Sequence, residues 1–152
     1  MRSSCINHPI KDHLIIIRRW QVDACSGNRC AAALLSFFEY WHNIKLEQSV
    51  KAHQANDVKE MHGDERDQDE SLWQWHKEQQ LEDGIIIYGR ATIGKALQLL
   101  ASKGFISVGK NPNPRYHFDK TRFILLHPAV INKWLVDRPL ISEGRTCKKE
   151  SR

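Results

Sequence analysis

Apolar residues recur every three or four positions in three stretches of the chain, which is the spacing of one face of an α-helix. The first stretch runs from Arg29 to about Lys45 and follows the break Ser26-Gly27-Asn28, whose polar side chains are suited to capping a helix. Its large aromatic and apolar face predicts a helix that packs into the core. The residues on that face are Ala33, Phe37, Tyr40, Trp41 and Ile44.

The second stretch predicts a helix from near Arg90 to Gly104, because glycine commonly terminates helices. Its expected inward face comprises Ile93, Ala96, Leu97 and Leu100, and its opposite face Arg90, Thr92, Lys95, Gln98 and Ser102. A third helix is expected after Pro128, a residue type tolerated in the first helical turn. Its expected inward face comprises Val130, Ile131, Trp134 and Leu135.

Two short runs between the second and third helices predict strands, from Phe105 to Val108 and from Thr121 to Leu126. The loop between them, GKNPNPRYHFDK, is too rich in Gly, Pro and Asn to continue either strand. A short helix is expected from Ser71 to near Gln80. Residues 14–20 fit a short strand or a packed helical turn.

The segment 46–70 is polar, and only its first half is suited to prolonging the first helix. Its second half predicts a solvated loop. We expect no metal site there, because hard cations need oxygen ligands that are held in convergent positions. The acidic residues of this loop are Asp64, Glu65, Asp67, Asp69 and Glu70.

Charge is distributed unevenly along the chain, whose formal net charge is +5. Residues 54–83 carry three Lys/Arg against ten Asp/Glu, whereas residues 84–152 carry thirteen against four. A strongly basic half of this kind favours a polyanionic partner. The alternative is a soluble basic surface with no nucleic-acid role.

Several functional classes receive no support from the sequence. The longest apolar runs are too short to cross a bilayer, and the start of the chain lacks the plan of a secretory signal. We therefore expect a cytoplasmic protein with reduced thiols and no membrane partner. No nucleophile elbow, phosphate loop or metal-ligand spacing is present, so we expect no enzymatic activity, cofactor or metal. A zinc site formed by Cys30, His42 and His76 is a remote alternative.

A helix followed by a hairpin with a basic tip is the layout of a winged helix-turn-helix, which places one helix in the major groove of DNA and a basic ribbon on the phosphates. We therefore predict a mainly α (α+β) fold with a two-stranded β-wing and a C-terminal helix. The domain spans 28–136, between an N-terminal arm (1–27) and a basic tail (137–152). The residues expected in the groove are Arg90, Thr92, Lys95 and Gln98, and those expected on or near the backbone are Lys110, Asn111, Arg115, Tyr116, Lys120 and Arg122.

Four segments resemble the winged-helix domain of bacterial phage and plasmid replication proteins, including replication initiators and proteins of the primosomal DnaD type. They are AALLSFFEYW (32–41), LWQWHKEQ (72–79), YGRATIGKALQLLASKGFI (88–106) and DKTRFIL (119–125). The resemblance implies a Trp-containing second helix, groove-facing Thr92 and Lys95, and Arg90 at the helix entrance. Gly94 departs from the pattern, because the family often has a basic residue there.

These observations lead us to expect a protein that binds double-stranded DNA, with a role in replication or regulation. The N-terminal arm is a candidate for homodimerisation. The alternative is a protein-interaction module in which the winged helix serves as an assembly surface, with other replication proteins as candidate partners. Its motivation is the apolar run Leu14–Ile17, the acidic loop and Leu99 on the helix flank.

Overall fold

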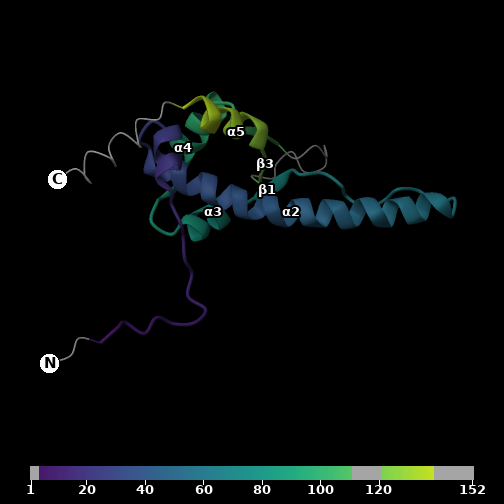
Figure 1. Cartoon of the computed structure of the whole chain (residues 1–152), viewed down its shortest axis with the longest axis horizontal. Helices are drawn as coiled ribbons and strands as arrows, with labels where there is room; N and C mark the ends of the chain where they lie inside the picture. Colours follow the sequence, from purple (N-terminus) through teal and green to yellow (C-terminus); the bar gives the residue numbers. More distant parts are fainter. Residues whose placement is uncertain (1–3, 111–120, 139–152) are drawn as a thin grey trace.

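The computed structural model describes residues 4–110 and 121–138, which form helices and a small antiparallel sheet (Figure 1). The coarse prediction of an α+β fold is confirmed, because both kinds of element are present. In chain order the elements are α1 (Arg19–Ala24), α2 (Arg29–Met61), β1 (Gln74–His76), α3 (Glu78–Ile85), α4 (Arg90–Ser102), β2 (Ile106–Gly109), β3 (Arg122–Leu126) and α5 (Pro128–Asp137).

Helix α2 is the longest element and begins where the sequence predicts. The Asn28 side chain accepts a hydrogen bond from the Ala31 amide at 3.0 Å, which caps the helix. The helix then continues for 33 residues to Met61, so the polar stretch after Lys45 does prolong it. Its distal half projects beyond the other helices and the sheet, and the following segment runs back alongside it (Figure 1).

The core lies between α2, α4 and the sheet. The expected inward face of α4 is confirmed, since Ile93, Ala96, Leu97 and Leu100 are all buried. Helix α2, however, buries a different face from the one predicted. Its large buried side chains are Leu34, Leu35 and Phe38.

The predicted aromatic face of α2 is therefore largely wrong as a core face. Ala33 is buried, but Tyr40 and Trp41 remain 61% and 37% exposed. The reason is that α2 is apolar on most of its sides between residues 30 and 41, so several faces fit a helical period. Contact with α4 selects the side that carries Leu34 and Phe38.

The sheet has three strands in the order β1-β3-β2, with both pairs antiparallel. Strands β2 and β3 form the predicted antiparallel pair, but the sheet is larger than predicted because β1 adds a third strand. The helix expected from Ser71 to near Gln80 is also wrong in its first half. Gln74 and His76 are buried while Trp75 is exposed, which is the two-residue alternation of a strand.

The remaining elements agree with the sequence in part. Helix α5 begins at Pro128 as predicted, but Val130 is exposed and only Ile131 of its expected face is fully buried. Residues 14–18 are neither strand nor helix, and α1 begins at Arg19. Over the residues that the structure describes, none of the helices has the length and apolar character needed to traverse a bilayer.

Candidate nucleic-acid interface

The face of α4 that points away from the core is polar and open. Arg90, Thr92, Lys95 and Gln98 are all exposed, whereas Ile93, Ala96 and Leu97 between them pack into the core. Gly104, in the left-handed conformation at φ +76°, follows the end of the helix, and the Phe105 amide donates to the Leu100 carbonyl at 3.1 Å. The helix is thus anchored on one side and capped, with its other side available for contact.

Three of the four predicted groove residues have side chains without a hydrogen-bond or ion-pair partner among the described residues. Among residues 4–110 and 121–138, no hydrogen bond or ion pair engages the side chain of Thr92, Lys95 or Gln98. They lie on successive turns at three-residue spacing, so they form one line along the helix. Amide, hydroxyl and ammonium groups in such a line suit base edges and phosphates.

Arg90, the fourth predicted groove residue, is engaged within the chain. Its Nε donates to Glu82 Oε1 at 2.8 Å, and its Nη1 lies 3.6 Å from Glu78 Oε2. A further donation reaches Gln79 Oε1 at 3.3 Å. Because α3 supplies all three acceptors, the Arg90 guanidinium ties the start of α4 to α3.

Arg122, predicted to bind the phosphate backbone, is also paired. It begins β3, is half-buried, and donates from Nη2 to Glu78 Oε1 at 3.2 Å. Glu78 therefore lies between Arg90 and Arg122, two cations far apart in the sequence. This shared carboxylate partly neutralises both guanidinium groups.

The tip of the predicted wing falls mostly beyond the described residues. Lys110, directly after β2, is exposed. The other predicted tip residues, Asn111, Arg115, Tyr116 and Lys120, lie outside the residues that the structure describes.

The turn between α3 and α4 is strained, a feature that the sequence did not indicate. Ile86 has φ +64° and ψ −54°, and the Ile87 amide donates to the Ile85 carbonyl at 2.7 Å, which closes a γ-turn around Ile86. A β-branched residue seldom adopts a positive φ. Ile86 and Ile87 are also 52% and 64% exposed, so this corner presents apolar side chains.

A groove of about 1130 Å³ lies between the N-terminal segment, α2, β1 and α3. Phe37, Trp41 and Trp75 contribute to its walls, which is why the aromatic stripe of α2 is not core. Lys45 Nζ lies 3.6 Å from the centre of the Trp75 ring, a cation–π contact. Sequence reasoning missed this groove because β1, which forms part of it, was expected to be helical.

His76 lies at the inner side of this groove, against the rings of Phe37, Phe38 and Trp41. Its Nε2 donates to Gln74 Oε1 at 2.9 Å, and the Gln74 amide donates to the Phe38 carbonyl at 2.8 Å. Burial, and to a smaller extent the charge of Lys45, lowers the pKa of His76 to about 4. The imidazole is therefore neutral at neutral pH.

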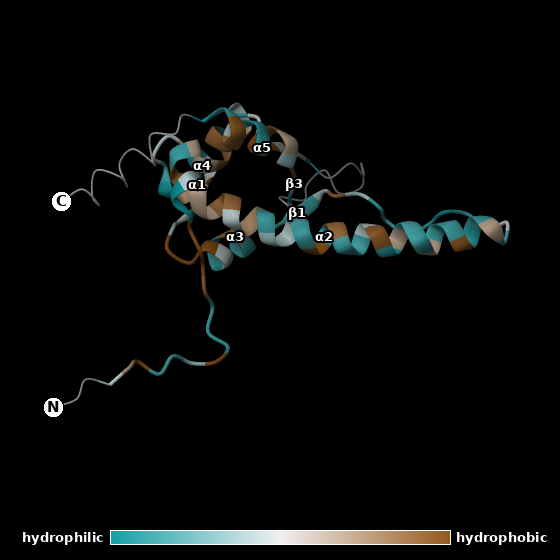
Figure 2. Ribbon diagram, in the orientation of Figure 1, coloured by the Kyte–Doolittle hydropathy of each residue, from teal (hydrophilic) through white to brown (hydrophobic). Residues whose placement is uncertain are grey.

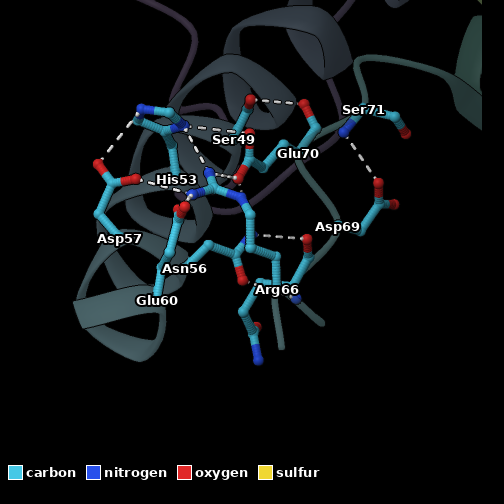
Figure 3. Close-up of polar contacts among 10 residues, drawn as sticks. Ser49, His53, Asn56, Asp57, Glu60, Arg66, Asp69, Glu70 and Ser71 are labelled. Carbon is cyan, nitrogen blue, oxygen red and sulfur yellow. Dashed lines mark hydrogen bonds and ion pairs between the residues drawn. The ribbon is translucent and has the colours of Figure 1, made fainter. Parts of the chain in front are cut away.

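The segment that follows α2 is an exposed loop, as predicted, but a network of polar contacts holds it against the helix (Figure 3). The Arg66 guanidinium lies 2.9, 2.7 and 2.6 Å from carboxylate oxygens of Asp57, Glu60 and Glu70. Asn56 donates to Glu70 Oε1 at 2.7 Å. Hydrogen bonds from Asn56, His53 and Arg66 lower the Glu70 pKa to about 2.

The cysteines that the structure describes are free thiols at positions 5, 25 and 30. Burial raises the pKa of both Cys25 and Cys30 to about 11, so both remain protonated and unreactive. Cys30 packs in the core as a small apolar residue. Within 4–110 and 121–138, no three His, Cys, Asp or Glu side chains are grouped so that they could hold a metal ion.

Comparison with known proteins gives no match, so we infer the function from the geometry. No protein-family model matches the chain, and no curated protein or solved structure resembles it at a significant level.

Proposed function

We propose that the protein binds duplex DNA through a winged helix-turn-helix in which α4 enters the major groove. The observation that carries the proposal is the pairing of α3 and α4. They contact each other and are joined by the four residues Ile86-Ile87-Tyr88-Gly89. A turn of three or four residues that contains glycine is typical of a helix-turn-helix, whose second helix reads the groove.

Two further features support the same proposal. The uncommitted side chains of Thr92, Lys95 and Gln98 line the second helix of the pair, on the side away from the core. Strands β2 and β3 follow α4 directly and form an antiparallel ribbon, with Lys110 at its end. Helix, ribbon and basic residues thus occur in the order that a groove helix flanked by a phosphate-binding wing requires.

The proposed biological role is that of a replication-associated or regulatory protein of phage or plasmid type. Its support is the resemblance of segments 32–41, 72–79, 88–106 and 119–125 to the winged-helix domain of replication proteins. One element departs from that pattern, because the Trp-containing segment 72–79 holds β1 and only the start of α3. The proposal of DNA binding therefore rests on α3, α4 and the ribbon rather than on the tryptophans.

The test is a fluorescence-anisotropy titration of random-sequence duplex DNA at several salt concentrations. We expect binding that weakens steeply with salt, because each neutralised phosphate contributes a slope of about −0.9 in log K against log salt. Lys95→Gln should weaken binding and reduce the magnitude of the slope by about 0.9. Lys11→Gln is the matched control, since it removes the same charge from the N-terminal segment. Absence of binding at low salt, or equal losses in the two variants, would refute the proposal.

The second candidate function is a protein-interaction module built on the same elements. The exposed pair Ile86 and Ile87, at the corner between α3 and α4, favours it, because exposed apolar side chains on a strained turn suit a protein contact. The two functions separate experimentally. Ile87→Lys should leave DNA binding intact if the corner contacts protein, whereas Lys95→Gln should leave a protein contact intact.

A further inference from the structure

The outer side of the distal half of α2 carries an apolar stripe without a partner among the described residues. Leu46, Val50 and Val58 are 46%, 52% and 54% exposed, and Met61 is 85% exposed. They recur at three- or four-residue steps, with Gln54 completing the row, so they share one helical face. Figure 2 shows apolar patches recurring along this projecting part of α2.

The opposite side of the same helix is already covered by the returning segment. Ser49 Oγ donates to the Glu70 carbonyl at 2.6 Å, and the Asn56 side chain exchanges hydrogen bonds with the Gln68 backbone, both at 3.0 Å. At 3.6 residues per turn, Ser49 and Asn56 fall more than a quarter turn away from Val50, Val58 and Met61. The returning chain therefore stiffens the projecting helix and leaves the stripe uncovered.

We propose that this stripe is a self-association surface, occupied by the same stripe of a second copy of the chain in antiparallel orientation. A two-fold axis at Gln54 places Val50 opposite the partner's Val58 and Val58 opposite the partner's Val50. The same register sets Lys51 opposite the partner's Asp57. Since a two-fold interface repeats every contact, two such charge pairs form, one on each side of the axis.

The charges of the projecting region agree with this arrangement, although the region is acidic overall. Most of its carboxylates have a cation within the chain: Arg66 binds Glu60 and Glu70 and also reaches Asp57 at the edge of the stripe, and Lys59 binds Asp67. On the stripe side, the one carboxylate that pairs with Lys51 among the described residues is the exposed Glu47, at 3.3 Å, which is a weak pairing in water. The partner's Asp57 offers it a second carboxylate next to buried apolar surface.

The first test measures the mass of the full chain in solution without DNA, by size-exclusion chromatography with light scattering over a range of concentrations. We expect a concentration-dependent dimer of twice the 17.7 kDa chain mass. Val50→Lys and Val58→Lys should each shift the protein to monomer, because a lysine would be buried opposite an apolar side chain. Val136→Lys, on α5, is the matched control, since Val136 is 82% exposed and lies outside the stripe. Circular dichroism confirms that each variant is folded.

The second test places a thiol on the proposed axis. In a background with Cys5→Ser and Cys147→Ser, Gln54→Cys should form a disulfide-linked dimer under mild oxidation, because the two thiols face each other across the axis. Gln48→Cys, which is also exposed but on another face of α2, should not. A wild-type monomer at every concentration, a dimer that survives both valine substitutions, or preferential cross-linking at position 48 would each overturn the inference. None of these outcomes bears on DNA binding, which is measured separately.

Discussion

Arg122 donates from Nη2 to Glu78 Oε1 at 3.2 Å, although the two residues are 44 positions apart in the chain. The other oxygen of the same carboxylate lies 3.6 Å from Arg90 Nη1. One acidic side chain at the start of α3 thus joins the start of β3 to the start of α4. It also partly neutralises two of the cations that we expected, from the sequence, to contact DNA.

This geometry predicts that Glu78 limits DNA binding. Glu78→Gln should release the Arg122 guanidinium and tighten binding to duplex DNA, whereas Arg90 keeps its contacts with Glu82 and Gln79. The slope of log K against log salt should steepen by up to about 0.9, for one added phosphate contact. Anisotropy titrations measure both quantities. Folding should change by about 1 kcal/mol or less, because the pairs are partly exposed.

Glu65→Gln is the control for the Glu78 variant, since it removes the same charge from an exposed position beyond the end of α2. If both variants raise the affinity equally, the effect is one of net charge alone. In that case the Glu78 contact does not hold Arg122 away from DNA.

Gly84 and Gly94 form a second, matched pair of predictions. A Cβ on Gly84 would lie 2.2 Å from the Phe37 ring, whereas one on Gly94 would meet nothing within 4 Å. Gly84→Ala should therefore destabilise the fold by about 1–3 kcal/mol, since the ring must move. Gly94→Ala should stabilise it by up to about 1 kcal/mol, because alanine favours a helix. Urea unfolding measures both, and Phe37→Leu should recover part of the loss in the Gly84→Ala background.

These residues also illustrate how far sequence reasoning reaches. The inward face of α4 was predictable, because Ile93, Ala96, Leu97 and Leu100 repeat over three turns and a glycine ends the helix. Strand β1 was not predictable from the sequence, because it is only three residues long and alternation over three positions is a weak signal. Its partner β3 is about 50 positions away, and only that pairing makes it a strand.

The candidate site divides in the same way. The exposed side chains of Thr92, Lys95 and Gln98 follow from periodicity alone, since they lie opposite the apolar face. The ion pairs of Arg90 and Arg122 with Glu78 cannot be predicted from periodicity, because they depend on how α3 and β3 meet in space. Residue type indicated that these arginines are cationic, but only the packing reveals their partner.

His76 predicts a pH dependence of stability. Its pKa is about 4 in the folded protein and near 6.5 when exposed, so between these values the unfolded chain binds a proton that the folded chain does not. Stability is therefore fully present above pH 6.5 and falls by about 3 kcal/mol as the pH drops to 4. Urea unfolding at several pH values should show this loss. His76→Gln should reduce it, because glutamine keeps a donor toward Gln74 but does not titrate.

The exposed His62 provides the control for His76. His62→Gln should leave the loss between pH 6.5 and 4 unchanged, because its side chain is exposed and lies outside the buried cluster around His76. If both variants reduced the loss of stability equally, the loss could not be assigned to the buried imidazole of His76.

The contacts of the returning segment predict that Asn56 holds residues 64–70 against α2. Asn56 is buried, and it hydrogen-bonds both the Gln68 backbone and the Glu70 carboxylate. The Glu70 pKa of about 2 is below that of an exposed glutamate, so its charge favours the closed arrangement above about pH 4.5 and that contribution is lost as the pH falls toward 2. Asn56→Ala should raise the Glu70 pKa toward its ordinary value and expose residues 64–70 to exchange. An NMR titration of the Glu70 carboxyl carbon, together with amide hydrogen exchange at pH 7, measures both effects.

Gln54→Ala, on the stripe side of the same helix, is the control and should change neither the Glu70 pKa nor the exchange of residues 64–70. An unchanged Glu70 midpoint in Asn56→Ala would show that Arg66 and His53 suffice to hold the segment.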